Sequence, residues 1–363
     1  MADSIRSPLA DYHVSQGAAL SEYRGGVVPA RFTSAGDEAR AVRAGSGLFD
    51  FSFRAKIAVT GADRVRFLHG MVSNDVKKLA PGAGNYAAIL NAQGQVLADL
   101  RLYAAEDRIF IDTDATLRDK ILTILRRYII ADKVVTEPLS LFALAFQGPR
   151  ARPLLAKTLH IDLPDLAEFG HFATNYAGFP ARVVRASSTG EDGYEVWMSE
   201  KAMMPIWGAA CGQAPTYDML PCGSEALETL RIEAGIPRYG TELGEDTLLL
   251  EANILNAVSF TKGCYIGQEN VERTRSRGHV NWKLVGLTIA GPVAPSPETK
   301  LIAEGKEVGE ITSSCVSPAL RKTIALAYVR RETAEPGTKL VLASGVPAEV
   351  AALPFHQKTE TGN

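Results

Sequence analysis

Cysteines and long apolar runs are both scarce in this sequence. The four cysteines are scattered, and none forms a Cys-x-x-Cys pair or a cluster with histidine. We therefore expect neither a disulfide framework nor a metal site. No stretch approaches the roughly 18 consecutive apolar residues of a membrane-spanning helix, so the sequence predicts no membrane partner. The N-terminal segment lacks the apolar core of a signal peptide and carries Asp3 and Asp11, which favours a cytoplasmic location.

A strong excess of one charge is also missing. The 363 residues include 39 Lys and Arg against 41 Asp and Glu, which gives a formal net charge of -2. This balance gives no electrostatic support for a nucleic-acid or membrane-surface partner, and no direct contact with nucleic acid is expected. Hydrophobic residues make up 46% of the chain, enough to bury a core, and the length suggests two or three domains.

Short strands alternate with helices over about the first 280 residues, without the glycine-rich turn of a dinucleotide-binding fold. This alternation indicates an α+β fold of two modules, at about residues 1–138 and 139–280. After that point, short strands recur at regular spacing and are separated by proline and glycine turns such as Pro336–Gly337. Residues 281–363 are therefore predicted to form a small C-terminal β-barrel.

Local signals predict several individual elements. Arg64–Gly70 is expected to be helical, with the side chain of Asp63 capping its N-terminus. Tyr86–Leu90 and Val96–Tyr103 are expected to be strands, and the turn at 91–94 should join them into a hairpin. The first forty residues are mixed and only weakly periodic.

The segment Lys262–Glu269, Lys-Gly-Cys-Tyr-Ile-Gly-Gln-Glu, holds one thiol between two glycines. Glycines so placed are typical of a loop that needs positive φ or close approach to a partner. A lysine precedes Cys264, and three arginines follow it: Arg273, Arg275 and Arg277. Cations near a thiol favour the thiolate, which is the form that acts as nucleophile or metal ligand. The alternative is a small, buried and inert cysteine, which is the commoner fate of a lone cysteine.

A second segment, Ser188–Glu195, is a polar turn that leads into a strand. The strand would place Tyr194 on one face and Glu195 on the other. A pterin ring presents an amino group beside a ring N–H, and one carboxylate can accept hydrogen bonds from both, so Glu195 suits that edge. The alternative is a solvated hairpin turn.

Two more charged residues are candidates. Asp99 lies in the otherwise apolar strand of Asn91–Tyr103, and because aspartate is depleted in strand interiors, it belongs either to a solvated face or to a site. Arg231, in Leu230–Pro237, suits a carboxylate such as a folate glutamate tail. The alternative for Arg231 is a solvated helix end.

Together these four segments resemble the folate-binding GcvT/YgfZ family, which comprises the aminomethyltransferase (T-protein) of the glycine cleavage system and its YgfZ-like relatives. The resemblance extends from about Phe49 to Pro336. Gly190–Glu195 and Leu230–Gly235 are similar to the pattern of both branches. Lys262–Glu269 resembles the signature K-G-C-Y-x-G-Q-E of the YgfZ-like branch.

The resemblance implies a GcvT-like fold with a pocket for tetrahydrofolate or a related folate. It implies that the pocket is surrounded by five residues, Tyr86, Asp99, Tyr103, Glu195 and Arg231. Asp99 would match the catalytic carboxylate of the transferases. The signature residues would be Lys262, Gly263, Cys264, Tyr265, Gly267, Gln268 and Glu269.

Three segments depart from the transferase pattern. The transferases have paired aspartates at Ala98-Asp99, Gly-Tyr-Thr-Gly-Glu at 187–191, and Asp-x-Ser-His at Asp50–Phe53. The second departure removes an aromatic wall of the pterin pocket. These differences favour retained folate binding over retained aminomethyl transfer.

The sequence therefore favours a YgfZ-like, tetrahydrofolate-binding protein that supports assembly or repair of iron–sulfur enzymes, including tRNA-modifying ones, through the thiol of Cys264. Its expected partners are iron–sulfur enzymes or cluster-assembly proteins. The alternative is an aminomethyltransferase that passes a one-carbon unit from a lipoyl-bound aminomethyl group to tetrahydrofolate, with Asp99 catalytic. A third hypothesis is a folate-dependent demethylase that acts on another methylated amine.

Overall fold

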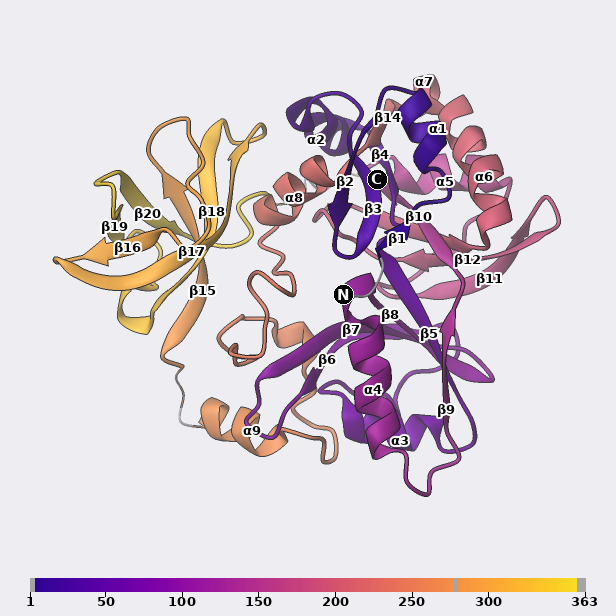
Figure 1. Ribbon diagram of the computed structural model, residues 1–363, viewed down its shortest axis with the longest axis horizontal. Helices are drawn as coiled ribbons and strands as arrows, with labels where there is room; N and C mark the ends of the chain where they lie inside the picture. The colour runs from indigo at the N-terminus through magenta and orange to yellow at the C-terminus, as the bar shows by residue number, and fades with distance from the viewer. Residues whose placement is uncertain (1–3, 277, 279, 358–363) are drawn as a thin grey trace. The chain divides into compact units, whose positions relative to one another are not determined.

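The structure is a computed structural model that describes residues 4–276, 278 and 280–357. Arg277, one of the three arginines that follow Cys264, lies outside the described residues. The chain divides into two units, which are built from interleaved segments (Figure 1). The first unit contains residues up to 89, 98–226 and 256–265, and the second contains residues 90–97, 227–255 and those from 266 onward.

Three sheets make up the first unit. A small sheet has the order β1 (Ile5–Arg6), β3 (Gly26–Arg31), β2 (Ala19–Tyr23). A six-stranded sheet has the order β11 (His171–Tyr176), β12 (Phe179–Arg185), β13 (Gly193–Met198), β10 (Phe142–Gln147), β4 (Ser46–Asp50), β14 (Met219–Cys222). A five-stranded sheet has the order β6 (Gly84–Leu90), β7 (Val96–Ala104), β8 (Arg108–Asp114), β5 (Arg54–Thr60), β9 (Val135–Leu139).

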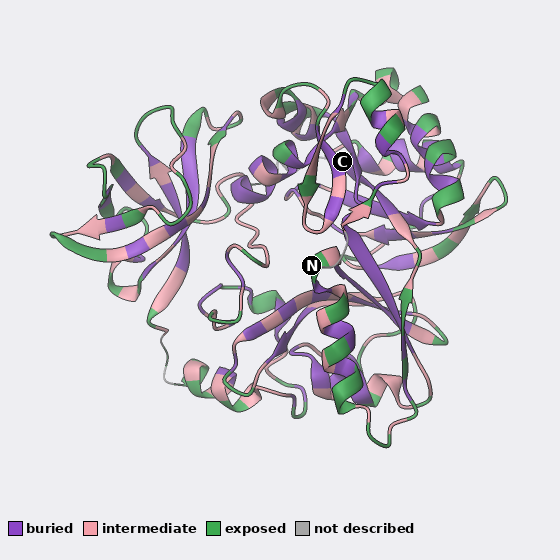
Figure 2. Ribbon diagram, in the orientation of Figure 1, coloured by how far each residue is buried: buried purple, intermediate pink, exposed green. Residues whose placement is uncertain are grey.

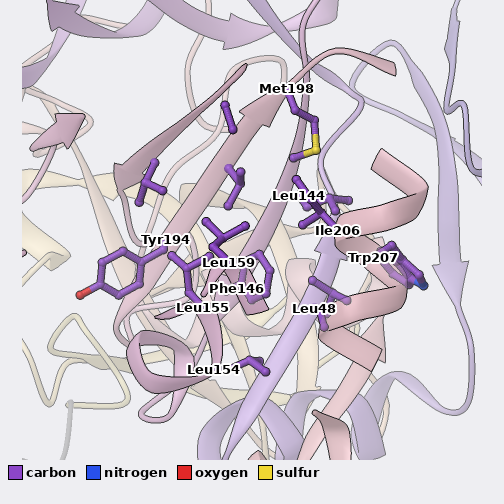
Figure 3. Close-up of a cluster of buried hydrophobic side chains, with 14 of the residues drawn as sticks. Leu48, Leu144, Phe146, Leu154, Leu155, Leu159, Tyr194, Met198, Ile206 and Trp207 are labelled. Atoms are coloured by element: carbon purple, nitrogen blue, oxygen red, sulfur yellow. The ribbon is translucent and has the colours of Figure 1, made fainter. Parts of the chain in front are cut away.

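The six-stranded sheet buries the main core of the first unit against two helices, α5 (Ala151–Leu159) and α6 (Glu200–Gly212). Leu144 and Phe146 of β10 point toward these helices, where Trp207 of α6 is 1% exposed (Figure 3). Tyr194 of β13 joins the same cluster, so the predicted split of Tyr194 and Glu195 to opposite faces is confirmed. Burial of each such side chain stabilises the fold by about 1.5–3 kcal/mol.

Two helices accompany the five-stranded sheet, α3 (Arg64–Met71) and α4 (Arg118–Tyr128). Helix α4 buries Ile121, Leu122 and Leu125 and exposes its opposite face (Figure 2). The predicted cap of α3 is wrong in one respect, because the Asp63 side chain makes no capping hydrogen bond. Its backbone lacks the extended conformation of a typical N-cap residue, and its carboxylate instead accepts a hydrogen bond from the Lys133 N–H at 2.8 Å.

The first forty residues contain more structure than their weak periodicity indicated. They hold the three short strands of the small sheet, helix α1 (Ala10–Ser15) and most of helix α2 (Ala35–Ala44). Ser34 caps α2 by accepting a hydrogen bond from the Asp37 N–H at 3.1 Å. The helix α7 (Ala214–Tyr217) and the 3-10 turn Ala115–Leu117 complete the first unit.

A closed barrel forms most of the second unit. Its strand order is β15 (Trp282–Ile289), β18 (Lys322–Arg330), β17 (Lys306–Ser317), β16 (Lys300–Ala303), β19 (Lys339–Leu342), β20 (Pro347–Ala351). Alternate residues fill its interior, among them Leu287, Leu301 and Ala327, each fully buried. Sequence signals predict strands at 284–289, 307–313, 324–329 and 339–342, and they missed β16 and β20.

Helix α8 (Ser224–Glu233) begins in the first unit and ends in the second, and α9 (Gln268–Ser276) belongs to the second. Two further 3-10 turns are Leu255–Ala257 and Arg331–Thr333. The hairpin turn at 91–94 is confirmed, because Gly94, at φ +81, donates its N–H to the Asn91 carbonyl at 3.0 Å.

The α+β class with a C-terminal barrel is confirmed. The module boundaries near 138 and 280 stay a prediction. Among residues 4–276, 278 and 280–357, no helix combines the length and the apolar character that crossing a membrane requires.

Candidate functional site

Strand β7 carries the centre of the candidate site in the first unit. Its period of two places Asp99, Arg101 and Tyr103 on one face. Asp99 is partly exposed, and its Oδ2 accepts a hydrogen bond from the Tyr86 hydroxyl of neighbouring β6 at 3.0 Å. Burial and the nearby Asp114 raise the pKa of Asp99, against the opposing effects of Arg54 and the Tyr86 hydrogen bond. The predicted pair Tyr86–Asp99 is therefore assembled.

A buried charge network lies beside Asp99 and was missed by the sequence analysis. Arg54 of β5 donates to Asp114 at 2.9 Å and makes a bidentate contact with Asp112 of β8. The Lys56 ammonium is 2.9 Å from Asp112 and is fully buried. Although burial works in the opposite direction, Arg54 and Lys56 lower the pKa of Asp112. Charged residues at alternate positions of apolar strands were the available signal, as for Asp99.

Glu195 lies in this network with both carboxylate oxygens engaged. Its Oε1 accepts from Arg101 Nη1 at 2.6 Å, and its Oε2 accepts from the Trp197 indole N–H at 3.0 Å. The Glu195 side chain is 0% exposed, whereas that of Arg101 is 13% exposed. The Lys56 ammonium lies 4.9 Å from the centre of the Trp197 ring. The structure thus places Glu195, the predicted pterin acceptor, next to the strand that carries Asp99. The guanidinium of Arg101, however, already binds its carboxylate.

The loop before Glu195 is built into the protein rather than solvated. Gln147 of β10 accepts hydrogen bonds from the Ser188 N–H at 2.9 Å and the Thr189 hydroxyl at 3.3 Å. Arg43 of α2 donates to the Thr189 carbonyl at 2.9 Å and to the Glu191 carboxylate at 2.8 Å. Two different elements therefore fix this loop, which holds Ser188 within 3.1 Å of Arg101 Nη2.

Tyr103, the second predicted residue on β7, is buried in the first unit. It is 0% exposed, and its hydroxyl has no hydrogen-bond partner among the residues that the structure describes. Its ring meets Trp197 edge-on at 5.0 Å and His171 at 5.6 Å. Burial raises the pKa of Tyr103 well above its ordinary value. Tyr103 therefore packs against Trp197, whose indole donates to Glu195.

Arg231 lies in the second unit, where it is 2% exposed. Its guanidinium donates to Glu242 at 3.0 Å, to Glu228 at 2.7 Å and to the Ser313 hydroxyl at 2.5 Å. The solvated helix end considered for Arg231 is therefore wrong. Three protein groups already use the donors that a ligand carboxylate would need.

The residues of the segment Lys262–Glu269 separate into buried and exposed positions. Cys264 is exposed, so the inert buried cysteine is wrong for this position. It lies at an open depression of about 440 Å³ in the first unit. The depression is lined by Arg66, His69, Gly70, Asp75, Lys77, Lys78, Thr261, Lys262, Gly263 and Cys264.

Lys262 has a structural partner set of its own. Its ammonium donates to the carbonyls of His69, Val72 and Asn74 at 2.5, 2.6 and 3.0 Å, where helix α3 ends. It also lies 4.8 Å from the ring centre of the buried Tyr265. Burial lowers the pKa of Lys262 to about 8. The lysine thus holds the end of a helix, a role that the sequence argument about thiolates did not foresee.

The rest of the signature falls in the second unit. Gly267 has φ +86, and a Cβ there would lie 2.5 Å from the Asn91 carbonyl oxygen, so only glycine fits. Gln268 begins α9, and Glu269 pairs with Arg273 at 2.5 Å. Close approach of backbone therefore explains the second glycine of the segment.

Two family models match the chain. The GCVT N-terminal domain matches residues 9–262, and the glycine cleavage T-protein C-terminal barrel domain matches residues 283–357. These matches together span both units.

Relatives match at nearly full length. An aminomethyltransferase from Rippkaea orientalis is 33% identical, over 98% of this chain and 99% of the relative. One from Bacillus subtilis is 32% identical, over 97% and 99% of the two chains. The crystal structure of glycine cleavage system aminomethyltransferase T from Bartonella henselae superposes with a TM-score of 0.91 at 25% identity, covering 98% of this chain and 99% of the other. The predicted GcvT-like fold is confirmed.

These relatives correct the function that the sequence favoured. Proteins similar over 97% or more of the chain are named aminomethyltransferases, so the iron–sulfur assembly role assigned to Cys264 is wrong. The YgfZ-like branch, the predicted role with tRNA-modifying enzymes and the iron–sulfur partners have no support among these relatives. The prediction of the YgfZ-like branch depended on the eight residues Lys262–Glu269. Most of these positions have the structural explanations given above.

Proposed function

We propose, starting from the fact that this chain belongs to the glycine cleavage T-protein family, that it is a tetrahydrofolate-dependent aminomethyltransferase. The aminomethyltransferases of this family use tetrahydrofolate, which agrees with the cofactor predicted from the sequence. The proposed donor is an aminomethyl group carried on the lipoyl arm of a glycine cleavage H protein, and that protein is the proposed partner. The aminomethyl carbon passes to tetrahydrofolate, its nitrogen leaves as ammonia, and the lipoyl sulfur that carried it is released as a thiol.

The observation that carries this proposal is the partly exposed carboxylate of Asp99. The sequence resemblance implies that it would correspond to the catalytic carboxylate of the transferases, and the Tyr86 hydroxyl donates a 3.0 Å hydrogen bond to it. Because burial raises its pKa, Asp99 exchanges a proton closer to neutral pH than an ordinary aspartate. Holding the two substrates in line at this carboxylate would supply much of the rate.

The residues around Asp99 have proposed roles of their own. Glu195 is proposed to recognise the donor edge of the pterin, and Tyr86 to border the reacting atoms. The Asp99 carboxylate is partly exposed, whereas the acceptor oxygens of Glu195 are held by Arg101 and Trp197. Arg231 is proposed as a structural residue of the same enzyme rather than a ligand clamp.

The test is release of ammonia from an aminomethyl-loaded lipoyl carrier protein in the presence of tetrahydrofolate. Asp99→Asn should lower turnover by about 10²–10⁴-fold, because asparagine cannot exchange the proton. Asp107→Asn is the matched control, since Asp107 is exposed and its carboxylate pairs with its neighbour Arg108. No turnover by the wild type, or equal turnover by Asp99→Asn, would contradict the proposal.

A further inference from the structure

The carboxylate of Glu195 is occupied by the protein itself. Arg101 Nη1 lies 2.6 Å from Oε1, and the Trp197 indole N–H lies 3.0 Å from Oε2. Glu195 is 0% exposed, so no part of the carboxylate faces solvent. A ligand can reach these oxygens only if one of the two donors leaves.

Arg101 is the donor that is able to leave. Its side chain is 13% exposed, whereas Trp197 is packed among Tyr103, Phe110 and Lys56. Trp197 also sits on the same strand as Glu195, two residues away, so it moves with the carboxylate. Arg101 reaches across from another sheet, on strand β7, and its other contacts are the Ser188 hydroxyl at 3.1 Å and Asp112 at 3.7 Å.

The Arg101 guanidinium and the edge of a pterin ring are chemically similar. A guanidinium is a planar group with N–H donors side by side on one carbon, and a pterin edge presents an amino group and a ring N–H in the same arrangement. Here Arg101 places one such donor, Nη1, on Glu195 Oε1, while its Nη2 donates to the Ser188 hydroxyl. The guanidinium has the advantage of its charge, since charge-assisted hydrogen bonds are about twice as strong as neutral ones.

We infer that Arg101 determines whether a pterin binds, because its guanidinium occupies the Glu195 carboxylate in place of the pterin edge. This inference rests on the proposed function and names the residue that sets its ligand specificity. Tetrahydrofolate binds only in competition with Arg101, which moves toward Asp112 when displaced. A ring without the paired donors cannot replace the guanidinium and is rejected.

Removal of Arg101 does not leave Glu195 without a cation. Arg54 and Lys56, both buried, act electrostatically on Glu195. The Trp197 indole also continues to donate to Oε2. A variant that lacks the guanidinium therefore retains a carboxylate with one free acceptor oxygen and compensated charge.

The experiment is calorimetric titration of the full chain, kept anaerobic, with tetrahydrofolate. Arg101→Leu should bind about tenfold or more tightly than the wild type, the expected gain when a charge-assisted competitor is removed. Arg101→Gln, which keeps a polar side chain, provides a second test if the leucine variant does not fold. Arg101→Lys keeps the charge and should bind as weakly as the wild type.

One further comparison tests the pterin edge, and another controls for the loss of an arginine. Arg101→Leu should gain affinity for pterin but not for lumazine, in which oxygen replaces the 2-amino group. Arg64→Leu is the matched control, because Arg64 is a partly buried arginine that donates to the carbonyls of Gly61 and Glu106, and its affinity should equal that of the wild type.

The outcomes separate the inference from the proposed function. Folate binding by the wild type with no gain in either Arg101 variant overturns the inference and leaves the proposed function standing. Binding by Arg101→Leu alone supports the inference and refutes the proposed function of the wild type. No binding by any variant refutes both.

Discussion

At the scale of single residues, His171 shows how burial fixes a protonation state. It lies 3% exposed on β11, with Arg182 Nη1 2.6 Å from its Nδ1 and the Ala104 carbonyl 2.9 Å from its Nε2. Arginine only donates, so Nδ1 accepts and Nε2 carries the hydrogen. Burial and Arg182 lower the pKa of His171 to about 4.

This pKa predicts a loss of stability in acid. In the folded state His171 resists protonation, whereas in the unfolded chain its pKa is near 6.5. The free energy of unfolding that His171 contributes above pH 6.5 is therefore lost as the pH falls to about 4. The loss should reach about 3 kcal/mol. Urea unfolding from pH 7 to pH 4 should show a shallower decline for His171→Gln than for the wild type. His160→Gln, at an exposed position, should decline like the wild type, and an unchanged slope for His171→Gln would contradict the prediction.

Other residues near the site show that charge and exposure decide their roles. Asp99 is partly exposed and has one side-chain hydrogen-bond donor, Tyr86, whereas Glu195 is fully buried with two donors, Arg101 and Trp197. Burial raises the pKa of the first, whereas the second is held by an arginine and an indole N–H. Both are carboxylates on strands, so the residue type alone does not distinguish them.

At the scale of elements, the end of α3 depends on Lys262. The last carbonyls of a helix have no partner within it, and here one ammonium takes the carbonyls of His69, Val72 and Asn74. The donor comes from more than 180 residues further along the chain. Lys262 thus connects the end of helix α3 to the loop before Cys264, although the two are far apart in sequence.

Lys262→Met should destabilise the protein by about 2–4 kcal/mol, because methionine fills the space but leaves two buried carbonyls and one partly buried carbonyl without their donor. The measurement is the midpoint of urea unfolding at pH 7. Lys78→Met is the matched control, since Lys78 is 75% exposed and 3.6 Å from Asp75, and it should change stability by less than about 0.5 kcal/mol. Equal effects of the two substitutions would show that the carbonyl contacts contribute nothing.

At the scale of the whole molecule, Glu242 links the segments of the second unit. It accepts hydrogen bonds from Arg231 of α8 and from Thr312 and Ser313 of barrel strand β17. Its backbone carbonyl accepts from the Tyr328 hydroxyl of β18 at 2.9 Å. One buried carboxylate thus connects the stretch 227–255 to the barrel.

Arg231→Met should therefore destabilise the protein by about 3–5 kcal/mol, because it leaves the buried Glu242 without its cation. Thermal unfolding followed by circular dichroism measures this loss. Arg273→Met removes an arginine that is 47% exposed and should cost less than about 1 kcal/mol. Unchanged stability in Arg231→Met, with a loss confined to folate affinity, would instead support a ligand clamp.

The fold class and the first residues of the site followed from local pattern. The apolar pattern of Val96–Tyr103 identified Asp99 as an unusual strand residue. Alternation along the strand assigned Tyr194 and Glu195 to opposite faces. Regular spacing of short strands indicated the barrel. These features could be predicted because periodicity, turn residues and helix or strand propensity depend only on a few neighbouring residues.

The remaining features were decided only by tertiary structure. Arg101 and Glu195 are 94 residues apart, and Lys262 is about 190 residues from the carbonyls it holds. Neither pairing has a local pattern, because it depends on which strands and helices pack together. The sequence by itself therefore determined which residues carry charge into buried strands, whereas the packing of those strands decided which charges neutralise one another and left Asp99 partly exposed.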